Sequence, residues 1–166
     1  FLELTNLKNT IVYFNLNIVK FFIFLLFLQL IIGAFVSGMD AGKIYNTWPL
    51  MGSSFFPDDS KLYEFFSITV FDSRSLVQFI HRNLAYLIII FYIYLCIIVF
   101  TQKDKTLYKY IFTIGITLLV QVILGILTIL SGVKILYASL HQINSILIIL
   151  SALYFLYMCK YKKKVI

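Results

Sequence analysis

The chain has 166 residues, of which 61% are hydrophobic and only 13% are charged. Because an average soluble domain carries about 25% charged residues, this composition excludes an ordinary soluble fold and indicates a membrane protein. The net charge of +7 comes largely from lysines between and after apolar segments, so it reports orientation in a membrane and gives no reason to expect nucleic-acid binding.

Four apolar segments are each long enough to cross a hydrocarbon core of about 30 Å, which takes about 20 helical residues. They cover residues 18–37, 76–100, 107–130 and 135–158. Apolar residues run continuously through them rather than alternating, which favours helices over a membrane barrel. The predicted fold class is all-α, an integral membrane four-helix bundle.

Three regions follow from these spans. Residues 1–17 lack the pattern of a signal peptide, and we expect them to be a connecting loop from an N-terminal half that precedes this chain. Residues 18–159 form the predicted transmembrane domain, and residues 160–166 form a basic tail. The lysines of this tail and of residues 101–110 place both on the inner side of the membrane.

A long loop is expected between the first two spans. It carries the only tryptophan and both prolines of the chain, with several glycines, which is typical of irregular, turn-rich structure. By the same charge rule it lies on the outer side of the membrane. There it either covers the mouth of the bundle or rests on the lipid headgroups.

The chain repeats one helical hairpin. QLIIG (residues 29–33) in the first span matches QVILG (residues 121–125) in the third, and His81 in the second span matches His141 in the fourth. The predicted bundle is therefore a duplicated transmembrane hairpin, with two repeats in the same orientation.

The two histidines lie at matched depth. Each follows a basic residue at the outer surface, Arg74 or Lys134, by seven positions, which places both imidazoles about 10 Å inward at 1.5 Å per residue. An isolated histidine near a helix end is usually interfacial. Two at one level on parallel helices favour a shared ligand.

The composition of the spans points to heme as that ligand. His81 and His141 are the only histidines, and no carboxylate or cysteine lies near their level within a span. Zinc usually needs a third protein ligand and a di-iron site needs several glutamates, whereas heme iron needs only two axial ligands. A bis-histidine heme fits these residues best.

Other residues near this level are candidates for cofactor binding. Gly33 and Gly125 allow either the close approach of a flat porphyrin or ordinary helix packing. Arg82 is suited to pair with a heme propionate, and Lys43 and Lys134 could reach one from the loops.

The second nitrogen of an axial imidazole is normally held by a hydrogen bond. Four polar side chains are near enough in sequence to provide it, and the sequence does not choose among them: Gln78, Gln142, Asn144 and Ser145.

The motifs GAFVSGMDAGKIYNTWPLMG, PDD, LVQFIHR, QVILGILTIL and ASLHQ occur in this order. Together they resemble the second half of heme A synthase, in the form found in mitochondria and their bacterial relatives, from about residue 24 to the end of the fourth span. The resemblance implies an eight-helix membrane oxidoreductase of two similar halves. It oxidises the C8 methyl group of heme O to the formyl group of heme A for cytochrome oxidase.

By this resemblance, His81 and His141 match the ligands of a b-type heme, heme b, that serves electron transfer or structure. The methyl oxidation is associated with the other half, so we expect no catalytic residue in this chain and no complete reaction from it alone. The resemblance also carries a departure, because some family members have a cysteine pair in an outer loop and this loop has none.

The expected partners are the N-terminal half of the same enzyme, the substrate heme O, heme O synthase, and a ferredoxin-like or quinol electron donor, with a homo-oligomer left open. The expected location is the bacterial cytoplasmic membrane or the mitochondrial inner membrane. Two alternatives stand beside this hypothesis: a stand-alone cytochrome b-like electron-transfer module, and a heme-free assembly or structural membrane protein.

Overall fold

The computed structural model describes residues 15–103 and 105–165, with side chains up to residue 160. Most of the connecting loop expected at residues 1–17 lies outside the described residues. The last two residues of that range belong to the first helix, which begins at Leu16.

Four long helices make up most of the described chain. They are α1 (Leu16–Gly38), α2 (Arg74–Thr101), α3 (Lys105–Leu130) and α4 (Ile135–Val165). All four are long and apolar enough to cross a membrane, which confirms the four predicted spans. Within the part of the chain that the structure describes there is no strand, so the all-α class is also confirmed.

The helix starts follow local hydrogen-bonding rules. The side chain of Asn15 accepts a hydrogen bond from the backbone N–H of Asn17, and that of Ser73 accepts one from Leu76. These bonds satisfy donors that the first turn of a helix leaves free. Further along each span the backbone groups bond within the helix, as a hydrocarbon environment requires.

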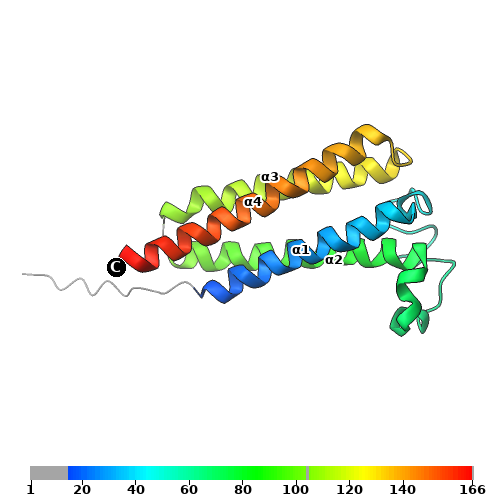
Figure 1. The fold of residues 1–166 in the computed structure, drawn as a ribbon, viewed down its shortest axis with the longest axis horizontal. Coiled ribbons are helices and arrows are strands. Elements are labelled where there is room, and N and C mark those ends of the chain that lie inside the picture. The colour runs from blue at the N-terminus through cyan, green and yellow to red at the C-terminus, as the bar shows by residue number, and fades with distance from the viewer. Residues whose placement is uncertain (1–14, 104, 166) are drawn as a thin grey trace, which may run out of the picture.

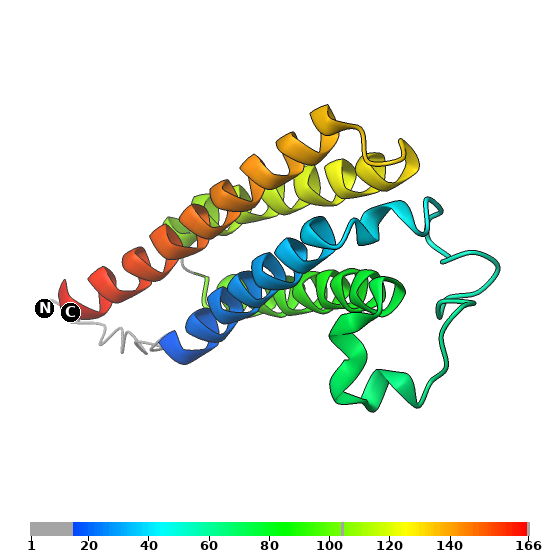
Figure 2. The same cartoon turned by 45° about the vertical axis from the view of Figure 1, so that its right-hand side comes forward.

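The helices run antiparallel to their neighbours along the chain (Figures 1 and 2). α1 pairs with α2 and α3 with α4, and contacts of α1 with α4 and of α2 with α3 close the ring. The start of α1, the α2–α3 turn and the end of α4 lie at one end, here called the termini end. Residues 39–73 and the α3–α4 turn lie at the other, the loop end, toward which the two hairpins diverge.

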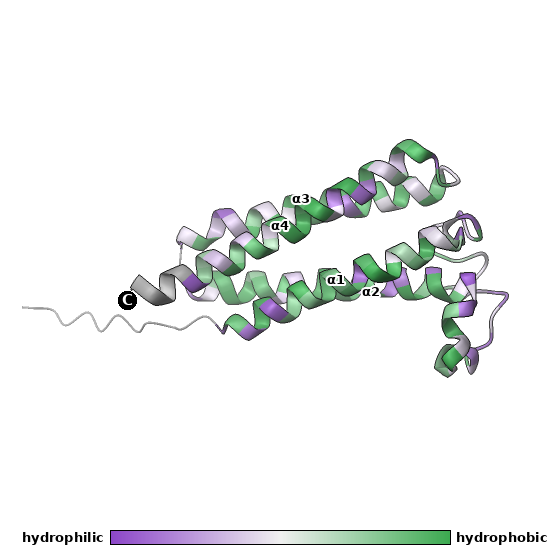
Figure 3. Cartoon of the chain, in the orientation of Figure 1, coloured by the Kyte–Doolittle hydropathy of each residue, from purple (hydrophilic) through white to green (hydrophobic). Residues whose placement is uncertain are grey.

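The hydrophobic core lies toward the termini end. Fully buried side chains from all four helices meet there, among them Phe22, Leu95, Ile111 and Phe155. The outward faces of the helices are also apolar (Figure 3), and many large apolar side chains remain exposed. Such a surface suits contact with lipid rather than with water.

Residues 39–73, which join α1 to α2, contain three short 3-10 helices. These are η1 (Ala41–Lys43), η2 (Glu64–Phe66) and η3 (Ile68–Asp72). Since η1 contacts both α1 and α2, the first part of this segment folds back against the end of the bundle (Figure 2).

The basic tail predicted at residues 160–166 continues α4 without a break as far as Val165. With 31 residues, α4 is about 46 Å long at 1.5 Å per residue. Because the hydrocarbon core is only about 30 Å thick, the tail leaves that core as part of the helix.

One polar contact fastens α2 to α3 across the bundle. The hydroxyl of Tyr92 donates a hydrogen bond of 3.0 Å to the carbonyl oxygen of Ile111. The ring passes directly over Gly115, where a Cβ would collide with the Tyr92 hydroxyl. A residue without a side chain is therefore required at this crossing.

We expect Gly115→Ala to lower the free energy of unfolding by about 1–3 kcal/mol, because the added methyl group overpacks the crossing and displaces the hydroxyl. Thermal unfolding in detergent measures the change. Tyr92→Phe in the same chain removes the clashing hydroxyl, so the double variant should lose less stability than the sum of the two single variants.

Gly38→Ala is the matched control, since a Cβ at Gly38 of α1 meets no atom within 4 Å. It measures the gain from alanine where no steric contact opposes it, which is at most about 1 kcal/mol, the value for a helix interior, because Gly38 ends α1. If Gly115→Ala is as stable as Gly38→Ala, the crossing does not depend on glycine.

Candidate functional site

In the first hairpin, His81 of α2 lies against two residues of α1. The side-chain nitrogen Nε2 of Gln29 lies 3.3 Å from Nε2 of the His81 ring and donates a hydrogen bond of 3.0 Å to the His81 carbonyl oxygen. One turn further along α1, a Cβ at Gly33 would lie only 3.1 Å from Cε1 of the ring. The imidazole therefore occupies the space that the glycine leaves.

The second hairpin repeats this arrangement between α3 and α4. Nε2 of Gln121 lies 3.2 Å from Nε2 of His141, and a Cβ at Gly125 would lie 3.0 Å from Cε1 of the ring. In addition, Nδ1 of His141 lies 3.1 Å from the main-chain oxygen of Gln121. The repeat predicted from the sequence is thus present as a repeated contact between side chains.

These contacts define the tautomer of the rings. An amide nitrogen only donates, so Nε2 of each imidazole accepts, and the ring proton lies on Nδ1. For His141 a second contact indicates the same tautomer, because Nδ1 faces a carbonyl oxygen, which only accepts hydrogen bonds. Each ring is a neutral imidazole with its lone pair on Nε2.

The two imidazoles lie at the same end of the bundle. His81 is seven residues after the start of α2 and His141 is six residues after the start of α4. Both side chains are partly buried, and Nδ1 of His81 is completely buried.

The partners proposed for the second ring nitrogen are not those that the structure shows. For His141 the partner is the main-chain oxygen of Gln121, across the hairpin on α3. Gln78 instead donates to the carbonyl oxygen of Tyr45, and Ser145 donates to its own helix, at Gln142. Asn144 does not contact the ring. Its amide donates to Oε1 of Gln121, whose nitrogen faces Nε2 of His141.

The pair of glutamines was missed as part of the site, although its signal was in the sequence. Gln29 and Gln121 open the repeated QxxxG motifs, and residues four apart lie on one face of a helix. A glycine that faces a ring therefore brings the glutamine to the same ring.

Arg82 is buried next to His81, but its guanidinium points to the loop end. Its two terminal nitrogens donate to the carbonyl oxygens of Leu50 and Tyr45, at 3.2 and 3.1 Å. Nε is buried without a hydrogen-bond partner among the described residues. The structure thus gives Arg82 a role that the sequence did not predict, which is to hold residues 45–50 over the bundle.

Residues 39–73 also contact the second hairpin. The amide of Asn46 donates to the carbonyl oxygen of Ile129, near the end of α3, at 3.0 Å. A Cβ at Gly42 would lie 3.2 Å from the side chain of Val133 in the α3–α4 turn. Lys43, a candidate propionate partner, instead forms an exposed ion pair with Asp40 at 2.8 Å.

Residues 14–153 match the model of a protein family described as cytochrome oxidase assembly protein. The chain belongs to this family. The match includes both hairpins as far as the middle of α4, and with them both histidines, both glutamines and both glycines of the site.

The curated relatives that the chain matches are named heme A synthase. The chain is 44% identical over 137 residues to the protein of Pelagibacter ubique and 38% identical over 132 residues to that of Wolbachia pipientis. These matches cover 82% and 80% of the chain, but only 40% and 36% of the relatives. The protein of Orientia tsutsugamushi is 39% identical, covering 92% of the chain and 41% of the relative. No solved structure is significantly similar.

The chain therefore spans less than half the length of the curated relatives that it matches. Its four apolar helices and its family make it an integral membrane protein. The bacterial sources of these relatives indicate a bacterial membrane.

The PDD motif, residues 57–59, organises the loop end. Asp58 accepts hydrogen bonds from the backbone N–H of Ser53 and from the hydroxyls of Ser53 and Ser54. The backbone N–H of Ser53, followed by the Ser54 hydroxyl, lowers the pKa of Asp58 below its ordinary value of 3.8. The charged carboxylate is thus the form that this turn requires.

Asp59 connects the same segment to α2. Its carboxylate accepts from Ser75 at 2.6 Å and from the hydroxyl of Tyr45 at 2.9 Å. Burial acts to raise the pKa of Asp59, but the hydrogen bonds from Ser75 and Tyr45 outweigh it, and the pKa is lowered.

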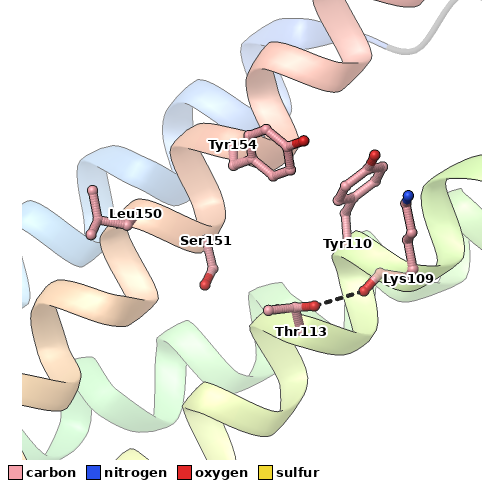
Figure 4. Close-up of a pocket in the computed structure, with 6 residues that line it drawn as sticks. All are labelled: Lys109, Tyr110, Thr113, Leu150, Ser151 and Tyr154. Atoms are coloured by element: carbon pink, nitrogen blue, oxygen red, sulfur yellow. Dashed lines mark hydrogen bonds between the residues drawn. The ribbon is translucent and has the colours of Figure 1, made fainter.

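A surface hollow of about 420 Å³ lies between α3 and α4, away from this site. Tyr110 and Tyr154 line it from opposite helices (Figure 4). Tyr154 is thirteen residues beyond His141 on α4, which is about 20 Å along the helix. The hollow is therefore not part of the imidazole site.

We expect the loop end to loosen only in acid. Because the folded pKa values of Asp58 and Asp59 are lowered, their contribution is complete above 3.8 and is lost as the pH falls below that value. The fluorescence of Trp48, the only tryptophan, should stay constant from pH 7 to about 4 and change below.

Asp59→Asn provides the comparison, since it removes one of the two hydrogen-bonded carboxylates named here and should weaken the acid transition. A transition centred above pH 5, or one that Asp58→Asn and Asp59→Asn both leave unchanged, would contradict this assignment.

Proposed function

We propose that this chain is the heme-binding half of a heme A synthase and that His81 and His141 are the two axial ligands of a b-type heme. The observation that carries the proposal is the pair of imidazoles at one end of an apolar bundle, each with Nε2 facing a glutamine amide nitrogen, which assigns the lone pair to Nε2. The family and the names of the relatives support the same function.

The residues present fit a heme. Axial ligation needs neutral imidazoles, and both rings here are held in the tautomer that leaves Nε2 able to bind iron. Among the described residues no group of three or more His, Cys, Asp or Glu side chains could hold a metal ion by itself. A ligand that needs only two protein donors and an apolar surrounding suits this site best.

A heme would transfer electrons in such a site, and while both histidines bind its iron it would not readily bind dioxygen or substrate there. The residues of this chain supply the framework for that role. Gly33 and Gly125 let the rings lie close to α1 and α3, and Gln121 fixes the His141 ring by its carbonyl oxygen. Arg82 and Gln78 hold residues 45–50 over the same end of the bundle.

In the complete enzyme, we propose that this half serves the oxidation of the C8 methyl group of heme O to the formyl group of heme A for cytochrome oxidase. The reaction itself belongs to an N-terminal half, and the electrons pass to or from a ferredoxin-like or quinol partner. Heme O synthase is the expected source of the substrate. No residue of this chain is assigned a catalytic role.

The second candidate is a stand-alone cytochrome b-like module that carries electrons in the membrane. The same pair of imidazoles supports it, because both ligands come from this chain. Restoring the N-terminal half separates the two: heme A formation by the joined halves supports heme A synthase, whereas its absence with an intact heme signal supports the module.

We expect the purified full chain to bind heme and to show a low-spin b-type spectrum in its oxidised and reduced forms. His81→Ala and His141→Ala should each abolish the low-spin signal, because one axial ligand is then missing. The double variant should bind heme at no specific site.

Gln142→Ala is the matched control beside His141, since Gln142 is exposed and should leave the spectrum unchanged. A folded wild-type chain that stays colourless after heme is supplied, with helical content verified by circular dichroism, would exclude the proposal.

The glycines give a second test. Alanine at Gly33 or Gly125 places a Cβ about 3 Å from the ring, so the imidazole must move by a few tenths of an ångström. We expect heme affinity to fall roughly tenfold, the lower limit for changes beside a metal ligand, as measured by heme titration. Gly38→Ala on α1 has open space around its Cβ and should bind as wild type.

A further inference from the structure

The two hairpins differ three residues after each histidine. Asn144 of α4 is buried and donates two hydrogen bonds to α3, one of 2.7 Å to Oε1 of Gln121 and one of 2.9 Å to the carbonyl oxygen of Thr117. The equivalent residue in α2 is Leu84, which has no polar side chain. In that hairpin Oε1 of Gln29 is buried without a partner among the described residues.

The two histidine rings also differ in their hydrogen bonds, and again the first hairpin lacks the bond that the second has. Nδ1 of His141 donates to the main-chain oxygen of Gln121, whereas Nδ1 of His81 is buried without a partner within the described part of the chain. Among the described residues, the one hydrogen bond to the His81 ring is therefore the one that Gln29 donates to Nε2.

Binding of iron at Nε2 would affect the rings unequally. Nε2 of a neutral imidazole has one lone pair, so a metal there displaces the glutamine amide. The His141 ring would then keep its bond to the main-chain oxygen of Gln121, and Asn144 would still fasten α4 to the Thr117 carbonyl oxygen of α3 beside that ring. The His81 ring would keep no hydrogen bond to any described residue.

A hydrogen bond at the second nitrogen fixes the orientation of an axial imidazole and raises its basicity. We propose, on the basis of the proposed function, that His141 is the fixed ligand of the heme and His81 the exchangeable one. Asn144 and Gln121 are positioning residues for His141. A small ligand would reach the iron only after His81 has left it.

The test uses the full chain, loaded with heme and purified in detergent, and measures heme affinity and the uptake of carbon monoxide by the reduced heme. His81→Ala should retain heme in a five-coordinate, high-spin form that binds carbon monoxide at once. His141→Ala should bind heme at least tenfold more weakly than His81→Ala. Equal losses, or a greater loss in His81→Ala, overturn the proposal.

Exchanging Leu84 and Asn144 between the hairpins gives a second measurement. It tests the inequality of the two ligands even if His141→Ala fails to fold. Leu84→Asn places at the equivalent position of α2 an amide able to fasten that helix to α1, as Asn144 fastens α4 to α3, and should slow carbon monoxide uptake about tenfold. Asn144→Leu removes the hydrogen bonds that fasten α4 to α3 beside His141 and should speed the uptake. Unchanged rates in both variants overturn the proposal.

The wild-type spectrum separates this inference from the proposed function. If the folded wild-type chain shows no low-spin heme, the proposed function itself fails. If wild type is low-spin and both single histidine variants behave alike, heme binding stands and only the inequality of the ligands is wrong.

Discussion

The contact between each imidazole and a glycine of the preceding helix is the constraint on which the site depends. Any side chain at Gly33 or Gly125 would meet the ring at about 3 Å, so the helices could not hold the rings at this distance. Because residues four apart share a helix face, the same register brings Gln29 and Gln121 to Nε2. One helical repeat thus determines the space for each ring, its hydrogen bond and its tautomer.

The groups around the imidazoles carry no net charge, which a hydrocarbon environment favours. The polar groups at the imidazoles are amides, carbonyl oxygens and neutral rings, which can satisfy one another without a net charge. Arg82 is the charged exception, and its guanidinium points out of the span to two carbonyl oxygens of the loop end. The apolar core occupies the opposite end, so polar and apolar packing are separated along the helices.

The spans and the placement of both histidines near one end of the bundle could be predicted from the sequence, because they depend on local properties, the length of apolar runs and the position of each histidine within its run. The helices begin and end within a few residues of the predicted spans, apart from the longer α4. The partner of Nδ1 of His141 could not be predicted, because a backbone carbonyl has no sequence signature. The direction of Arg82 depends on how residues 39–73 fold, which is a property of the whole chain.

The bond from Asn46 to Ile129 and the contact of Gly42 with Val133 give the loop end a mechanical role. Together with Arg82 they tie residues 39–73 to both hairpins, while the apolar core joins the same hairpins at the termini end. The imidazoles lie between these two sets of contacts, one at each end of the bundle. The spacing of α2 and α4 at the level of the rings is therefore set by the contacts at both ends, and it changes when the helices bend or when one set of contacts is released.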